Sequence, residues 1–78
     1  MEYDYSRLRG RIREKFGSEG NFADKIGMNR STFSLKCGNK SEFTQDEIFR
    51  ILQALGLDAA DIGNYFFTPV VEKSQQMN

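Results

Sequence analysis

The chain has 78 residues, enough for one domain, with eleven basic and eleven acidic side chains and an isoelectric point near 6.2. It holds one cysteine, Cys37, and no histidine, which excludes an intrachain disulfide and a zinc site of four cysteine or histidine ligands. No run approaches the roughly 18 apolar residues of a membrane span, and the acidic, aromatic start is unlike a signal peptide. We therefore expect a cytoplasmic protein.

The balanced total charge hides an uneven distribution. Residues 1–40 carry nine basic and five acidic side chains, a net charge of +4, and residues 41–78 carry two and six, a net charge of −4. Such a chain can turn a basic half toward nucleic acid and an acidic half toward solvent or a protein partner. Two ordinary mixed surfaces are the alternative interpretation.

Helical spacing recurs along the chain, whereas strand signals are weak. A first helix is predicted over about residues 5–16, with apolar residues such as Leu8 four apart on its inner face. Gly17 follows it, where a helix favours a left-handed cap. Ser18 is the predicted N-cap of a short second helix, which Gly27 ends.

The stretch that follows has the pattern of a helix-turn-helix. Ala23 is a small residue in the middle of the second helix, where a third helix can cross closely, and Gly27 supplies the turn. Phe33 and Cys37, four apart, are the predicted apolar anchors of the third helix.

Two more helices are predicted after a loop. Thr44 and Glu47 match a capping box, which opens a fourth helix that Gly56 ends. Asp58 begins a short fifth helix, and Pro69 limits its extension. Five short helices joined by tight loops are therefore expected.

The residues 21–34, NFADKIGMNRSTFS, resemble the helix-turn-helix of the Cro/CI-type (Xre-like) phage regulators. Residues 40–57 resemble that family's next helices, and residues 5–67 as a whole are similar to small prophage-encoded proteins of this type. The resemblance implies an all-α, compact, five-helix lambda-repressor-like domain over residues 1–69, followed by a polar, frayed tail over 70–78. It also implies a transcriptional repressor that reads operator DNA by sequence.

In such proteins the recognition helix, here beginning near Asn29, lies in the major groove. By resemblance, the residues expected to contact bases are Asn29, Arg30, Ser31, Ser34 and Leu35. Those expected to contact phosphates are Ser18, Asn21, Thr32, Lys36, Asn39 and Lys40. The arginine row of residues 7–13 fans around its helix and is interpreted as a solvated face with partial phosphate contact.

One position departs from the family pattern. Lys36 stands where these regulators usually have an apolar residue. Either Cys37 takes over as the anchor or the helix is rotated, so the sequence leaves open whether Leu35 or Lys36 faces DNA. Leu35 also has a second interpretation, as a core residue that covers Phe43.

A regulator of this class usually binds as a dimer. The carboxy-terminal end has more apolar groups than a short exposed helix should carry, and the candidate homodimer surface is Ile62, Tyr65, Phe66 and Phe67. In the alternative, Ile62 and Phe66 fold back on the first helix and only Phe67 is left exposed.

A different class of function is a protein-interaction module on a helix-turn-helix scaffold, of an antirepressor or antitoxin type. An enzyme is not expected, because the sequence has no phosphate-binding glycine loop and no nucleophile with a histidine base. No cofactor, metal, membrane partner or small-molecule ligand is expected either.

Overall fold

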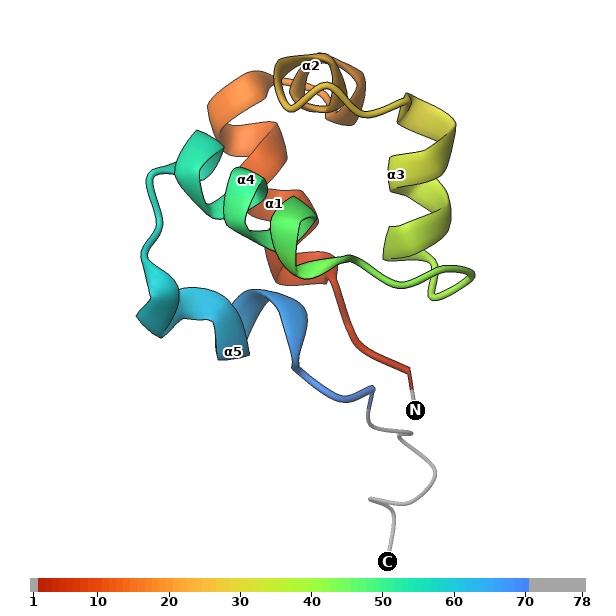
Figure 1. Ribbon diagram of the computed structural model, residues 1–78, viewed down its shortest axis with the longest axis vertical. Coiled ribbons are helices and arrows are strands. Elements are labelled where there is room, and N and C mark those ends of the chain that lie inside the picture. Colours follow the sequence, from red (N-terminus) through yellow and green to blue (C-terminus); the bar gives the residue numbers. More distant parts are fainter. Residues whose placement is uncertain (1, 71–78) are drawn as a thin grey trace, which may run out of the picture.

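The five predicted helices are present, in order and near their predicted bounds. The computed structural model describes residues 2–70. Figure 1 shows α1 and α4 in the middle of the molecule, α2 above them, α3 to one side and α5 below. The elements are α1 (Ser6–Phe16), α2 (Glu19–Lys25), α3 (Arg30–Cys37), α4 (Gln45–Leu55), the 3-10 helix η1 (Ala59–Asp61) and α5 (Ile62–Phe66). None of these helices is long and apolar enough to cross a membrane.

The predicted caps set the helix ends. The Ser18 hydroxyl accepts a hydrogen bond from the backbone N–H of Asn21 at 3.1 Å at the start of α2. At the start of α4, Thr44 and Glu47 form the reciprocal capping box. Gly56 ends α4 in the left-handed conformation, with φ of 69°. Short side chains and glycines at these points satisfy backbone groups that a helix end leaves unpaired.

The turn between α2 and α3 has the order and spacing of a helix-turn-helix. Gly27 adopts a φ of 72°, which is the left-handed backbone that only glycine takes cheaply. The N–H of Met28 then returns to the carbonyl of Ala23 at 2.9 Å. Asn29 caps α3, because its side-chain oxygen accepts the N–H of Ser31 at 2.8 Å. Ala23 itself is fully buried, as a helix crossing requires.

A chain of aromatic rings ties the helices into one core. Phe16 meets Phe22 at 5.0 Å between ring centroids, and Phe22 meets Phe33 at 5.8 Å. Phe33 meets Phe43 at 5.9 Å, and Phe43 meets Phe66 at 5.4 Å. All four contacts are edge-to-face, the geometry that aromatic quadrupoles favour. The chain links α1, α2, α3, the loop before α4, and α5.

The two ends of the described chain pair with each other, which the sequence does not predict. Tyr3 and Pro69 form an isolated antiparallel bridge, and the N–H of Asp4 donates to the carbonyl of Thr68 at 2.7 Å. The N–H of Val70 donates to the carbonyl of Glu2 at 3.1 Å. Val70 is thus held in place, and the rest of the predicted frayed tail, 71–78, lies outside the described residues.

Candidate recognition surface on helix α3

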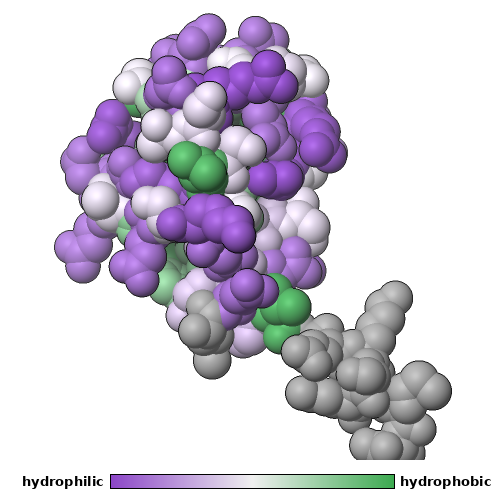
Figure 2. Space-filling model, turned by 90° about the vertical axis from the view of Figure 1, so that its right-hand side faces the viewer, coloured by the Kyte–Doolittle hydropathy of each residue, from purple (hydrophilic) through white to green (hydrophobic). Residues whose placement is uncertain are grey.

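The outer face of α3 is built from small polar side chains around one apolar residue. Arg30, Ser31, Thr32 and Ser34 are exposed, and Leu35 is 52% exposed. Figure 2 views the side of the molecule on which α3 lies and shows a small hydrophobic patch among pale and hydrophilic side chains. A shallow hollow on this face is lined by Arg30, Ser31, Ser34 and Leu35.

The structure settles which side of α3 faces outward. Cys37 is 7% exposed and Phe33 is fully buried, so these two residues anchor α3, as one of the two predicted arrangements requires. Leu35 points away from the core, and the interpretation that it covers Phe43 is wrong. Since successive helix residues are about 100° apart, an outward Leu35 turns Lys36 inward.

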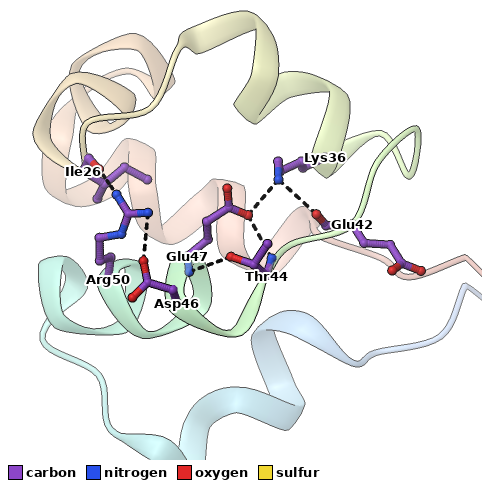
Figure 3. A network of polar contacts seen from close by, with 7 residues as sticks. All are labelled: Ile26, Lys36, Glu42, Thr44, Asp46, Glu47 and Arg50. Atoms are coloured by element: carbon purple, nitrogen blue, oxygen red, sulfur yellow. Dashed lines mark hydrogen bonds and ion pairs between the residues drawn. The ribbon is translucent and has the colours of Figure 1, made fainter.

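Lys36 is therefore not placed to contact phosphate, contrary to the sequence prediction. Its side chain is buried and its Nζ donates to Oε1 of Glu47 at 2.7 Å and to the carbonyl of Glu42 at 3.0 Å. Figure 3 shows this contact joined to the capping box, since the same Glu47 oxygen accepts the N–H of Thr44 at 2.8 Å. The lysine replaces an apolar anchor with an ion pair between α3 and α4.

Burial on its own would raise the pKa of Glu47. The hydrogen bond from Lys36, the N–H of Thr44 and the positive charge of Lys36 outweigh this effect, and the pKa of Glu47 lies below its usual value. The carboxylate is therefore charged at neutral pH and holds the lysine in place.

The side chain of Asn39 also makes hydrogen bonds inside the molecule. Its side-chain oxygen accepts the N–H of Tyr3, and its side-chain nitrogen donates to the carbonyl of Tyr3, both at 2.9 Å. The amide thus clamps the amino-terminal segment and is not free for phosphate. At the start of α2, Asn21 donates to the carbonyl of Phe16 at 3.1 Å, and Ser18 serves as the cap. Of the predicted phosphate contacts, Thr32 and Lys40 keep exposed side chains with no partner among the described residues.

Most of the basic side chains near the amino terminus are already paired. Glu19 lies 3.6 Å from both Arg9 and Arg13, and Arg11 meets Glu14 at 3.2 Å. Two carboxylates, one from α1 and one from α2, thus pair with three of the four arginines of α1. Within residues 2–70, the cations without a hydrogen-bond or ion-pair partner are Arg7, Lys25, Arg30 and Lys40.

Arg50 is another cation whose side chain is engaged by contacts inside the molecule. One guanidinium nitrogen donates to the carbonyl of Ile26 at 3.0 Å, and another lies 3.1 Å from the carboxylate of Asp46 (Figure 3). This contact fixes the turn between α2 and α3 against α4. The Asp46 pair is an ordinary i,i+4 contact along α4, whereas the bond to Ile26 spans 24 residues and is not predictable from the sequence.

The predicted homodimer surface is only partly exposed. Phe66 is fully enclosed, with its ring 5.4 Å from that of Phe43, so it is not available to a second copy. Ile62 and Tyr65 are half-buried against the core. Phe67 is 50% exposed, and its ring packs edge-on against Tyr3. The alternative, in which this helix folds back and leaves Phe67 outside, describes the arrangement.

The surroundings of Cys37 disfavour the reactive thiolate form of its side chain. Burial is the main influence, and although a hydrogen bond from Arg9 opposes it, the pKa of the thiol rises to about 11. Within residues 2–70, no three cysteine or acidic side chains are grouped so that they could hold a metal ion. Among the described residues, the exposed face of α3 thus carries neither a reactive thiol nor a metal-binding cluster.

Comparison with known proteins gives a family and a solved relative. A family model described as "Protein of unknown function (DUF739)" matches residues 1–69. No curated protein matches the chain. The chain is similar to the modulator of repression (MOR) of the temperate bacteriophage TP901-1 from Lactococcus lactis, whose solution structure has been solved. The two are 43% identical, with a TM-score of 0.76 over 92% of this chain and 97% of that one.

These matches support one part of the resemblance drawn from the sequence. The expected likeness to a small phage regulatory protein is found, since the relative is one by its name. The matching family model, however, is not that of the Cro/CI-type regulators. The chain belongs to the DUF739 family.

Proposed function

We propose that this protein modulates phage repression by binding a repressor protein, and that the exposed face of α3 makes the contact. The observation that carries the proposal is the 43% identity, over nearly the full length of both chains, to a modulator of repression. A modulator acts on a repression system, and a repressor is the protein component that such a system must contain.

The composition of the α3 face supports a protein partner over DNA. Phosphate contacts usually make half or more of the hydrogen bonds to DNA. Here Lys36 and Asn39, two of the predicted phosphate contacts, are turned to internal partners. An apolar side chain at the centre of a face of small polar groups, as Leu35 is, suits the desolvated centre of a protein interface.

The test is a titration of the repressor encoded in the same phage genome with this protein, followed by fluorescence anisotropy or calorimetry. We expect a complex, at least about tenfold weaker for Leu35→Ser and for Arg30→Ala, which corresponds to about 1.4 kcal/mol. Lys25→Ala is the matched control, because Lys25 is exposed and unpaired on α2 outside the α3 hollow, and should change affinity less than twofold. No complex with the repressor, or equal loss in the control, would contradict the proposal.

A second candidate is sequence-specific operator binding, and the exposed start of α3 favours it. Arg30 and Ser31 follow the well-capped turn and are free to meet base edges, with Ser34 one turn further on. Selection from random duplex DNA tests this candidate. A selected duplex with two-fold symmetry should bind about a thousandfold better than a scrambled duplex, and Arg30→Ala should abolish this binding. That outcome would establish operator binding in place of the protein contact.

A further inference from the structure

An apolar groove of about 590 Å³ separates α4 from η1 and α5. Its apolar lining comes from both walls: Ile48, Phe49 and Leu52 from α4, then Leu57, Ile62 and Phe67. The volume lies within the range of about 300–1,000 Å³ in which proteins hold ligands. The groove shares no lining residue with the α3 hollow, so it is a second surface, independent of the function proposed above.

The groove is formed before anything binds. Leu52 is nearly fully buried, and Ile48, Leu57 and Ile62 pack against the core, which fixes the floor. Each wall begins with a capping box. One is that of α4, and the other is made by Asp58 and Asp61, where the N–H of Asp58 donates to the Asp61 carboxylate at 3.1 Å. A pre-organised site loses little conformational entropy on binding.

Two phenylalanines at the rim are half exposed or more. Phe49 is 58% exposed on α4, and Phe67 is 50% exposed after α5. The ring of Phe67 contacts Tyr3, with 5.5 Å between ring centroids, and leaves its other side open toward the groove. Aromatic side chains beside a pre-formed apolar hollow are typical of interface centres, where they lose water on binding.

One end of the groove is acidic. Asp58 is the only ionisable side chain in its lining. Asp61 lies beside it, since its carboxylate accepts the N–H of Asp58 at 3.1 Å. An apolar occupant is therefore favoured if it brings positive charge.

We propose that the groove binds an amphipathic α-helix of a partner protein, with aliphatic side chains in the groove and lysine or arginine on its flanks. Both walls are helical and offer no unpaired strand edge, so helix-in-groove docking is the mode that fits. In a two-fold contact, a second copy of this chain would set Asp58 and Asp61 of one groove against the same residues of the other. Three of the four arginines on α1 are, moreover, already paired with internal acids.

The experiment uses two synthetic helical peptides and ¹⁵N-labelled protein followed by NMR. One peptide has leucine at i, i+3, i+4 and i+7 with lysine at the outer positions, and the other has glutamate in place of every lysine. We expect the lysine peptide to shift the amide signals of α4, η1 and α5, and the glutamate peptide to bind at least about tenfold more weakly.

Three variants locate the contact. Phe49→Ser removes a rim ring from an exposed position and should weaken the lysine peptide at least about tenfold. Gln53→Lys places a positive charge at the rim, near the end of α4 where a helix tolerates it, and should weaken the lysine peptide and strengthen the glutamate peptide. Leu35→Ser, the matched loss of an exposed apolar side chain on α3, should leave both affinities within twofold. Thermal melts confirm that each variant is folded.

Equal binding of the two peptides, shifts centred on α3, or an unchanged affinity in Phe49→Ser would overturn the proposal. Groove shifts that appear on concentrating the protein alone would overturn it as well, because they assign the groove to a second copy. The repressor titration uses variants of the other face, so failure of one proposal is distinguishable from failure of the other.

Discussion

Lys36 and Glu47 form an ion pair that is largely shielded from water, with 9% and 16% of their side chains exposed. Removing one partner of such a pair leaves an uncompensated charge. We expect Lys36→Met to lower the free energy of unfolding by about 3 kcal/mol, measured by urea denaturation. The double variant Lys36→Met, Glu47→Gln removes the stranded charge and should recover at least half of the loss. A double variant no more stable than the single one would contradict this account.

The lowered pKa of Glu47 gives the same pair a pH dependence. Because the folded-state pKa lies below the unfolded value near 4.5, the contribution to stability is complete above that pH and is lost as the pH falls through the folded-state pKa. Unfolding free energies measured from pH 6 downward should therefore fall less steeply in Glu47→Gln than in the wild type. The pKa of Asp4 is also lowered, by hydrogen bonds from the side chain and backbone of Ser6, but Asp4 is present in both proteins and cancels in the difference.

The buried thiol of Cys37 should resist modification. With a pKa of about 11, roughly one thiol in a thousand is ionised at pH 8, and the thiolate is the reactive form. A coloured disulfide reagent should react with the folded protein at least about a hundredfold more slowly than with the urea-unfolded chain. A folded protein that reacts at the unfolded rate would mean that α3 opens readily.

At the scale of elements, the loop after α3 owes its shape to one residue. Asn39 has a φ of 63° and holds Tyr3 through two hydrogen bonds. Asn39→Gly keeps the backbone conformation but loses both bonds, and should cost about 1–2 kcal/mol. Asn39→Ala should cost about 1 kcal/mol more, because alanine disfavours a left-handed backbone.

Amide hydrogen exchange checks the same contact directly. The Tyr3 amide donates to Asn39, so it should lose its protection in both variants. The Met28 amide, bonded to Ala23 in the turn between α2 and α3, serves as the control and should be unchanged. Unchanged exchange at Tyr3 would show that the amino-terminal segment is held by the pairing with 68–70 alone.

The helices could be predicted from the sequence because their signals are local. The capping box of Thr44 and Glu47 spans three residues, and Gly27 and Gly56 mark ends that a left-handed backbone requires. The residues that line the core repeat with helical spacing, so the inner faces followed as well. Local chemistry marks where these helices begin and end, and packing of their apolar faces in the core stabilises them.

The candidate site was predicted less well because its decisive contacts are remote in sequence. Lys36 meets a carboxylate eleven residues away, and Asn39 meets a backbone thirty-six residues away. No pattern within α3 reveals either partner. The outward orientation of Leu35 follows from Phe33 and Cys37 being the anchors of α3, because Leu35 lies on the opposite side of the helix from both. The sequence left open which residue anchors the helix beside Phe33.

At the scale of the whole molecule, the net charge of +4 over residues 1–40 overstates how many cations are free to contact a nucleic acid. The unpaired cations within residues 2–70 are Arg7, Lys25, Arg30 and Lys40. Even if all of these met phosphates, the slope of log K against log salt would be no steeper than about −4. We expect weak binding to random duplex DNA with a shallow slope, measured by anisotropy across salt concentrations. A steeper slope would mean that cations beyond these four also reach phosphates.

The pairing of Tyr3 with Pro69 brings the start and finish of the fold to one place on its surface. The two ends of the described chain are therefore neighbours. A short linker across this junction should allow circular permutation, with new ends cut in an exposed loop, and two short linkers should allow the whole domain to be inserted into a surface turn of a carrier protein. The protein can thus be joined to a carrier through this single place on its surface.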